Sequence, residues 1–296
     1  MGEGATAARR DRRASPCSGV VTLVALVELG RGVIAPDTPV LHADDEGVLR
    51  GRSVFETLRA YRGKPFRLAA HLDRLAGSAE RLRLAPPPPG AFVAAVAEAI
   101  AAAGLPDATV RLLWTAGREG GGPPAGLVLV STLPPGHEEL RERGLRLAVV
   151  EWAAGALAGA KSTSYAENIA AQNEAAERGA DYALLVAPDG TVLEAPTSNV
   201  WFREGDRLLT PSLSLPILAG VTRATVCELA PQAGYAVEEG SFGLARLLGA
   251  DEVFLTSSVR EVMPVRSIDG AEIARGPAAA ALQAALRAAA GYPEQR

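Results

Sequence analysis

Cysteine, histidine and lysine are scarce in this sequence of 296 residues. The two cysteines, Cys17 and Cys227, cannot form a disulfide framework, and neither has a second cysteine or a histidine at metal-ligand spacing. The three histidines are scattered, which argues against a histidine-rich metal site. We therefore expect no metal, and a reduced cytoplasmic compartment is the default for such cysteine usage.

An excess of positive charge and long apolar runs are missing as well. The net charge is −4 and the isoelectric point is about 5.6, so neither nucleic acid nor an anionic membrane surface is indicated as a partner. The apolar run at residues 20–29, VVTLVALVEL, has ten residues and is too short to span a bilayer. The polar, arginine-rich residues 1–19 show no periodicity, and we interpret them as a disordered tail or an over-extended start.

The rest of the chain is long enough for one large or two modest domains. Apolar positions at helical spacing predict helices over 68–84, 91–105, 168–179, 220–234 and 278–291. Apolar runs bounded by turn residues predict strands at 20–28, 53–67 (a hairpin around Gly63), 109–117, 126–133, 145–152, 182–188, 191–196, 199–204 and 252–258. Because helices and strands are grouped rather than alternating, we expect an α+β protein in two parts, 20–133 and 146–296, joined by a connector at 134–145.

Lysine is the scarcest cation in the chain. Lys64 and Lys161 are the two lysines among 30 basic residues, and the others are arginine. An arginine stays protonated, whereas a partly desolvated lysine amine can lose its proton and attack a carbonyl. Lys161, in LAGAKSTSYAEN, is therefore a candidate for covalent catalysis, although a chance surface lysine, as we expect for Lys64, gives the same count.

Other segments contain groups that suit such chemistry. Glu194 ends a predicted strand, where its carboxylate could keep a pyridine nitrogen protonated, although a surface glutamate in a hairpin explains it equally. Gly220, Val221 and Thr222 begin a predicted helix, which suits either a phosphate site or a plain helix cap. Arg74 belongs to a helix as a potential salt-bridge residue, and the segment LTSSV at 255–259 adds hydroxyl groups.

In this order, five segments of the sequence resemble the class IV aminotransferases, the fold-type IV enzymes that use pyridoxal 5′-phosphate (PLP). They are VFETLRAYRGKPFRLAAHLDRLAGSAERL, KSTSYAENIAAQNEAAERGAD, GTVLEAPTSNVWF, LTPSLSLPILAGVTR and DEVFLTSSVREVMPV, and the likeness runs from about Val20 to Arg275. The resemblance implies a small N-terminal α/β domain and a larger C-terminal PLP-binding domain with a β-barrel-like core. It also implies a homodimer with active sites near the subunit interface, acting on a small amino substrate.

The resemblance also assigns roles to individual residues. Lys161 matches the lysine that binds PLP covalently and then moves protons, Glu194 the partner of the pyridine nitrogen, and Arg74 the phosphate-binding arginine. The remaining cofactor contacts would come from Val221, Thr222 and Ser258 at the phosphate, Tyr165 at the ring oxygen and Leu218 on the ring face. The sequence departs from the family at residues 51–53, where Gly-Arg-Ser stands in place of the common Gly-Asp-Gly.

The family includes both transaminases and 4-amino-4-deoxychorismate lyase, which releases pyruvate and leaves 4-aminobenzoate for folate synthesis. The stretch Phe55–Glu56–Thr57 matches the lyase pattern, in which the threonine assists near the leaving part of the substrate; branched-chain aminotransferases tend to have glycine there. The lyase is therefore favoured modestly over a branched-chain or D-amino acid transaminase, and a catalytically silent binding subunit is a remote alternative. Phe55, Arg59 and Arg118 are candidate substrate residues, although both arginines suit a plain surface role.

Overall fold

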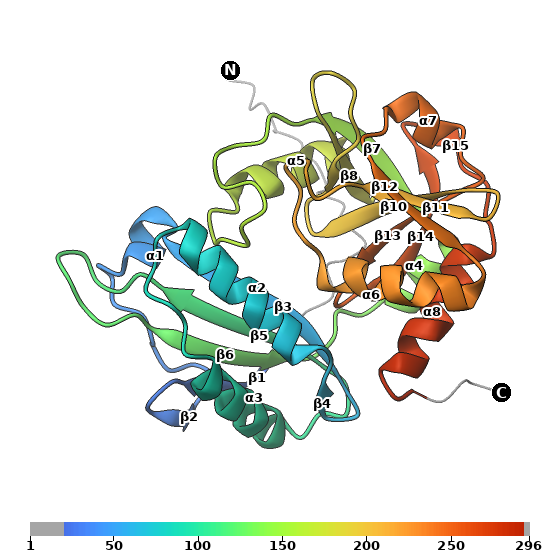
Figure 1. Ribbon diagram of the computed structural model, residues 1–296. Helices are drawn as coiled ribbons and strands as arrows, with labels where there is room; N and C mark the ends of the chain where they lie inside the picture. The colour runs from blue at the N-terminus through green and yellow to red at the C-terminus, as the bar shows by residue number, and fades with distance from the viewer. Residues whose placement is uncertain (1–20, 293–296) are drawn as a thin grey trace, which may run out of the picture.

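The computed structural model describes residues 21–292, so the interpretation of residues 1–19 as a disordered tail lies outside the described residues. Two sheets and their helices form two lobes that face each other (Figure 1). The first sheet has the strand order β2-β1-β6-β5-β3-β4. Its strands are β1 (Leu23–Glu28), β2 (Gly32–Ile34), β3 (Ser53–Tyr61), β4 (Lys64–Pro65), β5 (Ala108–Thr115) and β6 (Gly126–Ser131).

Two helices, α2 (Leu68–Arg81) and α3 (Pro89–Ala103), cover one face of this sheet. The alternation of side chains along a strand sends even-numbered residues such as Val54, Leu58 and Val110 into the core beneath the helices. Odd-numbered residues of the same strands therefore face the other lobe. The run PPPPG at residues 86–90 follows α2, and its last proline, Pro89, begins α3, where a missing N–H costs nothing.

The second sheet is strongly curved, and its half-barrel shape agrees with the barrel-like core that was expected. The strand order is β12-β11-β10-β13-β14-β7-β8, with β9 paired to β10 and β15 to β14. Its strands are β7 (Leu145–Glu151), β8 (Tyr182–Val186), β9 (Glu194–Ala195), β10 (Ser198–Glu204), β11 (Arg207–Pro211), β12 (Ala236–Gly240), β13 (Glu252–Ser257), β14 (Glu261–Ile268) and β15 (Ala271–Glu272).

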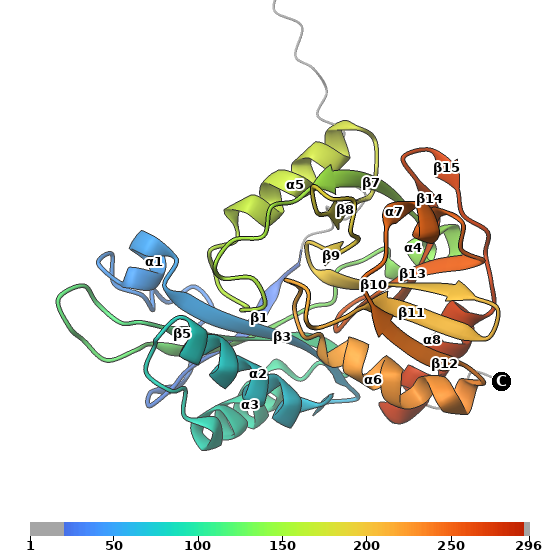
Figure 2. The same ribbon diagram turned by 45° about the horizontal axis from the view of Figure 1, so that its top comes forward.

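Helices cover this second sheet on its outside. Figure 2 shows α5 (Ala166–Glu177) over β7 and β8, and α6 (Val221–Leu229) and α8 (Ala278–Ala289) on the opposite side. The 3₁₀ turn η1 (Ala230–Ala233) follows α6 where Pro231 interrupts the predicted helix. Shorter helices are α1 (Glu46–Arg50), α4 (His137–Arg143) and α7 (Leu244–Leu248).

The α+β class expected from the sequence is confirmed, and most long elements lie where periodicity predicts them. The connector contains the helix α4, which the sequence reading missed, and we keep residues 134–145 as the proposed boundary. Strands β11, β12 and β14 were missed as well. β11 and β12 are only five residues long, and β14 contains Pro264, which breaks the usual strand pattern. None of the helices within residues 21–292 combines the length and apolar character needed to cross a membrane.

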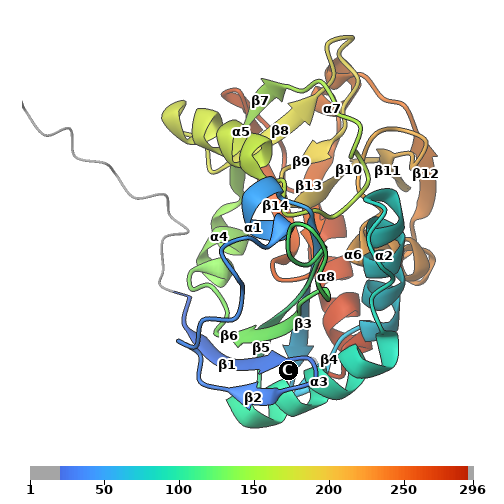
Figure 3. The ribbon, with the colours of Figure 1, turned by 90° about the vertical axis from the view of Figure 1, so that its left-hand side faces the viewer.

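The two lobes meet along α2 and the start of α6, which run beside each other (Figure 3). Arg67 at the beginning of α2 forms an ion pair with Glu228 of α6, and Arg74 Nη1 donates to the carbonyl of Ala219 at 2.9 Å. The segment that follows β7 crosses back to the first sheet, where the backbone N–H of Phe55 donates to the Lys161 carbonyl at 3.0 Å. These contacts place Lys161 between the lobes.

Candidate active site

A cavity of about 630 Å³ lies between the two lobes. The outward face of the first sheet forms one wall, and Lys161, the start of α6 and the turn after β13 form the others. Nine of the candidate site residues predicted from the sequence line it, and Glu194 contacts the lining residue Leu218. Those in the lining are Phe55, Thr57, Arg74, Lys161, Tyr165, Leu218, Val221, Thr222 and Ser258.

Lys161 lies in the loop between β7 and α5, and its backbone is held from both sides. Its N–H donates to Ser78 Oγ at 3.0 Å, and Nζ lies 4.6 Å from the centroid of the Phe55 ring. The approach requires glycine at position 159, where φ is +79° and a Cβ would lie 3.2 Å from Arg81 Nη1. Burial lowers the pKa of the Lys161 ammonium to about 8, although nearby Glu56 and Glu194 act in the opposite direction. The neutral, nucleophilic amine is thus accessible near physiological pH.

Glu194 begins β9 and is held by donors from neighbouring segments. The Leu218 N–H donates to it at 3.1 Å and Asn199 Nδ2 at 3.0 Å. Burial raises the pKa of the Glu194 carboxyl to about 8, while the Leu218 hydrogen bond and the charge of Lys161 lower it in part. A carboxyl in this position needs a cation beside it to stay ionised, and a protonated ring nitrogen would supply one.

Arg74 is oriented by a carboxylate on the opposite face of β3 from the cavity. Glu56 accepts hydrogen bonds from Arg74 Nε and Nη2, each at 2.7 Å. Its carboxylate also shares a hydrogen bond of 2.7 Å with His71 Nδ1. Burial alone would raise the pKa of Glu56, but the hydrogen bonds of Arg74 and His71 lower it to about 2. Sequence reasoning gave Glu56 no role, yet strand alternation places it opposite Phe55 and Thr57, where a buried carboxylate requires a partner.

The start of α6 lies next to Arg74 and leaves its first-turn N–H groups without a side-chain cap. Gly220 precedes the helix, and no side chain of the described residues caps the first turn at Val221 and Thr222. A Cβ on Gly220 would lie 1.9 Å from Asn199 Oδ1, so only glycine fits there. The unpaired N–H groups and the positive end of the helix dipole therefore favour an anion such as a phosphate. Ser258 Oγ lies 3.5 Å from His71 Nε2 on the same side.

Tyr165 and Leu218 line the cavity. The Tyr165 hydroxyl donates to the Pro196 carbonyl at 2.6 Å, and its ring meets Phe55 edge-on with the centroids 5.7 Å apart. The backbone of Leu218 is fixed through Glu194, and its side chain belongs to the lining. Their contacts to the cofactor remain predictions from the resemblance.

Two of the predicted substrate residues lie elsewhere. Arg59, on the same strand face as Thr57, continues past the cavity into a buried cluster around Glu261. Arg118 forms an ion pair with Asp44 at 2.8 Å on the surface. The glycine-rich loop of Arg118 is held against the segment before α1, because the Glu119 N–H donates to the Asp44 carbonyl at 2.8 Å. The unusual Arg52 forms an ion pair with Glu46 of α1. The structure does not bring Arg59 or Arg118 to the cavity of this chain.

Several lining residues were not predicted. Arg111 of β5 lies directly opposite Thr57 of β3 in the sheet register, and both face the cavity. Strand alternation could have found Arg111, since it shares a face with Thr109 and Leu113. His137 of α4 joins the lining from the connector, and burial, with the charges of Arg260 and Arg141, lowers its pKa to about 4, so its imidazole is neutral. The other unpredicted lining residues are Val21, Thr109, Leu113, Leu127, Leu129, Pro134, Thr163, Thr197, Ser257, Val259 and Arg260.

Comparison with known proteins identifies the family. The profile of the family "Amino-transferase class IV" matches residues 53–268. A bifunctional aminodeoxychorismate lyase / D-amino acid transaminase from Mycobacterium tuberculosis is 34% identical over 86% of this chain and 94% of its own length. The aminodeoxychorismate lyase of Bacillus subtilis is 32% identical over 78% of this chain and 82% of its own.

Solved structures support the same conclusion. A hypothetical aminotransferase from Mycobacterium tuberculosis is 33% identical and covers 90% of this chain and 98% of its own. Its PLP-bound form superposes with a TM-score of 0.84, and its form with alpha-ketoglutarate and PMP with 0.86. An amine of lowered pKa, a carboxyl that needs a cation and an arginine beside a helix N-terminus together fit PLP. The chain therefore belongs to the class IV aminotransferase family of PLP-dependent enzymes.

Proposed function

We propose that the protein is an aminodeoxychorismate lyase that releases pyruvate and 4-aminobenzoate. The observation that carries this proposal is the pairing of Thr57 with Arg111 across β3 and β5, on the face that lines the Lys161 cavity. A hydroxyl and a guanidinium beside each other suit a substrate that carries a carboxylate and an oxygen-linked leaving part. The lyase activity in the names of two relatives, from Mycobacterium tuberculosis and Bacillus subtilis, supports the same choice.

The residues of this chain divide the work between two ends of the cavity. Arg74 and the first turn of α6 would bind the phosphate of PLP, and Glu194 would keep its ring nitrogen protonated. When bound, PLP withdraws electrons from the substrate's α-carbon, which makes the α-proton acidic. The neutral Lys161 amine would take that proton at Nζ, and Phe55 and Tyr165 would shield the amine from water.

Thr57 and Arg111 would act on the part of the substrate farther from the cofactor. Arg111 would bind a carboxylate through its guanidinium, and the Thr57 hydroxyl would donate to the oxygen of the breaking bond. The products together contain all the atoms of aminodeoxychorismate, so the elimination needs no oxo acid. This property separates the lyase from a transaminase.

A second candidate, transamination of an amino acid, is favoured by a different observation. Arg111 offers a site for the distal carboxylate of a dicarboxylic oxo acid, and the related Mycobacterium structure has alpha-ketoglutarate and PMP bound. Lys161 would remove the same α-proton in both reactions, and only the later fate of that proton would differ, so one site can support both outcomes. We therefore infer transamination as a second activity of the same cavity.

The test is to supply aminodeoxychorismate to the PLP-loaded enzyme without any oxo acid. Release of pyruvate, followed by lactate dehydrogenase, together with 4-aminobenzoate fluorescence, supports the lyase. No release, with amino transfer from D-alanine or a branched-chain amino acid to 2-oxoglutarate, would replace the first proposal with the second. If the protein binds PLP but shows neither activity, the remaining alternative is a catalytically silent binding subunit.

We also propose that the protein is a homodimer. Large apolar side chains are exposed on α1, where Val48 and Leu49 are about half exposed, and at Leu157 and Ile169. Gly51, just after α1, accepts a hydrogen bond from Ser164, so the two segments are neighbours. Apolar residues exposed together on one side are typical of a protein interface. Light scattering coupled to size exclusion tests this proposal, and a monomeric mass at micromolar concentration would contradict it.

A further inference from the structure

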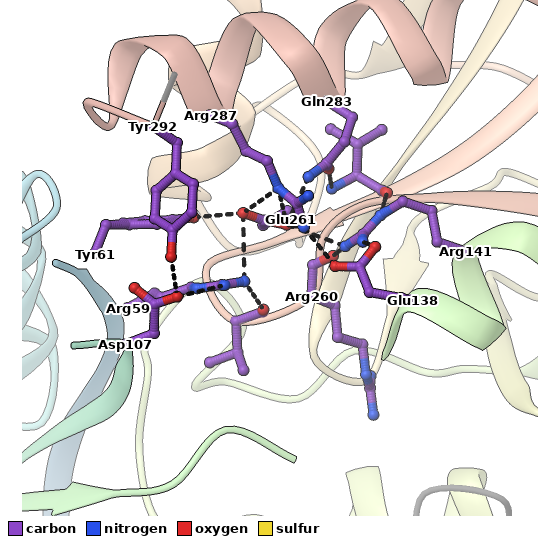
Figure 4. A network of polar contacts seen from close by, with 12 residues as sticks. Arg59, Tyr61, Asp107, Glu138, Arg141, Arg260, Glu261, Gln283, Arg287 and Tyr292 are labelled. Carbon is purple, nitrogen blue, oxygen red and sulfur yellow. Dashed lines mark hydrogen bonds and ion pairs between the residues drawn. The ribbon is translucent and has the colours of Figure 1, made fainter. Parts of the chain in front are cut away.

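A buried polar cluster lies directly behind one wall of the cavity (Figure 4). We call it the Glu261 cluster. Its centre, the Glu261 carboxylate, is fully buried and accepts hydrogen bonds or ion pairs from five side chains. They are Arg59 Nη1 at 3.3 Å, Tyr61 Oη at 2.9 Å, Arg141 Nη2 at 3.1 Å, Gln283 Nε2 at 2.6 Å and Arg287 Nη2 at 2.9 Å.

The charges in the Glu261 cluster are balanced, and they come from both lobes. Arg59 belongs to the first sheet, whereas Arg141 lies on α4 and Arg287 on α8. Asp107 pairs with Arg59, and Glu138 pairs with the other two arginines, which gives three carboxylates for three guanidinium groups. Burial alone would raise the pKa of Glu261, but the hydrogen bond of Arg287 and the charges of Arg59 and Arg287 hold it below its ordinary value, so the carboxylate is ionised.

Glu261 also has an unusual backbone. It follows the turn at residues 258–260 that joins β13 to β14, and its φ of +62° lies in the left-handed region that side chains other than glycine rarely adopt. Such a conformation persists only where the surroundings impose it, and here the imposed geometry aims the carboxylate into the cluster. The preceding two residues, Val259 and Arg260, line the cavity.

Side chains of the cluster hold the backbone of this turn from behind. Arg59 Nη1 donates to the Val259 carbonyl at 3.5 Å, and Arg141 Nη2 donates to the Arg260 carbonyl at 2.9 Å. Arg141 Nε donates to the Val262 carbonyl at 3.1 Å, and the Val262 N–H donates to Gln283 Oε1 at 2.9 Å. Each of these three side chains is itself oriented by the Glu261 carboxylate. The carboxylate is therefore linked to the cavity wall through two successive contacts.

We propose that Glu261 is a positioning residue for substrate binding, which fixes Arg59 and Arg141 so that they hold the Val259–Arg260 turn in place as a wall of the cavity. The proposal rests on the proposed function only in taking this cavity as the substrate site. It gives Arg59 an indirect role in substrate binding in place of the direct one expected from the sequence. Among the described contacts, none joins the cluster to Lys161, Arg74 or the start of α6. Ser258, which the resemblance places at the phosphate, directly precedes the two held residues but is not itself bonded to the cluster, so the proposal concerns substrate affinity rather than the proton transfer.

The chain offers a matched control in Glu252. Its residue exposure is 1%, it pairs with Arg203 at 3.3 Å, and it accepts from the N–H groups of Ala278 and Ala279 at the start of α8. None of these partners lines the cavity. Glu252→Gln therefore measures what the loss of a buried, ion-paired carboxylate does to the fold alone, and Glu261→Gln adds the effect on the turn.

The experiment compares both variants as PLP-loaded enzymes. We expect both to lower the melting temperature, while only Glu261→Gln raises KM for the amino substrate, by about tenfold, with kcat changed by less than about threefold. Hydrogen exchange in a peptide covering residues 257–262 should be faster in Glu261→Gln and unchanged in Glu252→Gln. The visible absorbance of bound PLP should persist in both.

Two results would overturn the proposal. The first is a Glu261→Gln enzyme with wild-type KM and wild-type exchange at residues 257–262, and the second is a loss confined to kcat. If the wild type turns over neither substrate, the proposed function fails, and the exchange comparison still decides the role of Glu261. If Glu261→Gln does not fold, the second variant is Arg59→Lys. It keeps the charge but loses the guanidinium, whose Nη1 contacts Val259 and Glu261 while Nη2 faces Asp107. It should give the same rise in KM and in exchange, and unchanged values would equally overturn the proposal.

Discussion

The carboxylate of Glu56 binds the guanidinium of Arg74 at two points, with both hydrogen bonds 2.7 Å long. The third arm of the guanidinium, Nη1, is thereby aimed at the Ala219 carbonyl, immediately before the first turn of α6. The pair thus connects the helix-covered core of the first sheet to the anion-binding end of the cavity. Glu56 does not line the cavity, yet it determines where the lining residue Arg74 lies.

Replacing Glu56 by glutamine should weaken the binding of PLP by about tenfold to a hundredfold, because outer partners orient the groups that hold a ligand. The dissociation constant from the absorbance of bound PLP measures the effect. The control is Glu80→Gln, a substitution of an exposed residue on α2, the helix that contains Arg74. Equal affinity in both variants would show that Arg74 does not need Glu56.

Replacing Gly220 by alanine should remove most PLP binding, because the new methyl group would lie 1.9 Å from Asn199 Oδ1. Moving Asn199 would also disturb its hydrogen bonds to Glu194 and to the Leu218 carbonyl. Gly77 is the matched control, since a Cβ there meets open space within α2. Gly77→Ala should keep full PLP binding and raise stability by about 0.5–1 kcal/mol, as alanine does in a helix interior. Comparable PLP binding by the two variants would contradict the close approach.

The rate at which PLP reacts with the cofactor-free protein should rise with pH and level off above about 8. Burial lowers the pKa of Lys161 to about 8, and only the neutral amine is nucleophilic. Stopped-flow absorbance across pH 6–10 gives the profile, and Lys161→Arg supplies the background. A midpoint close to the ordinary lysine value would mean that the amine is not desolvated.

The stability of the cofactor-free protein should fall as the pH rises from about 4.5 to about 8. Burial raises the pKa of Glu194 from 4.5 to about 8, so within this window the folded protein holds a proton that the unfolded chain has lost. Above about 8 the lowered pKa of Lys161 acts in the other direction, because the unfolded chain then holds the additional proton.

Urea unfolding of the cofactor-free protein at several pH values measures this dependence, with PLP absent throughout. In Glu194→Gln the fall in the free energy of unfolding between pH 4.5 and 8 should become shallower. An identical pH dependence in the variant would assign the effect to other groups.

Replacing Thr57 by valine should lower lyase turnover more than transamination. The change keeps the shape of the side chain and removes the hydroxyl that faces the cavity opposite Arg111. General acid assistance typically contributes a factor of about 10²–10⁴, so we expect a loss of at least about a hundredfold in kcat for pyruvate release. Transamination assayed on the same preparation is the internal control, and parallel losses in both would assign Thr57 to substrate binding in general.

Local patterns were sufficient for much of this fold. Helical spacing found α2, α5 and α8 within a few residues, and the scarcity of lysine singled out Lys161 as the candidate amine. The α+β class, the family and the cofactor followed from the ordered motifs and are confirmed. The short strands β11 and β12 were missed because their pairing depends on neighbours far along the chain.

The position of Arg59 outside the cavity could not be predicted, for a different physical reason. Strand alternation shows that Arg59 shares a face with Thr57, but it cannot show how far along that face the cavity extends. The partners of Arg59, Glu261 and Asp107, are distant in sequence, and no local pattern predicts such contacts. The left-handed backbone of Glu261 was equally hidden, because glutamate gives no sign of a positive φ.

The alternation along β3 separates two requirements that an enzyme of this family must meet. Glu56 belongs to the face that orients Arg74, which we propose binds the cofactor's phosphate, whereas Phe55 and Thr57 belong to the face that lines the proposed substrate site. Substitutions at Thr57 or Arg111 can therefore change which amino compound is accepted while the pairing of Glu56 with Arg74 stays intact. Insertion or deletion of one residue within the strand would exchange the two faces and abolish both properties at once. Divergence of specificity on this scaffold should therefore proceed by point substitution at odd-numbered positions of β3 and β5.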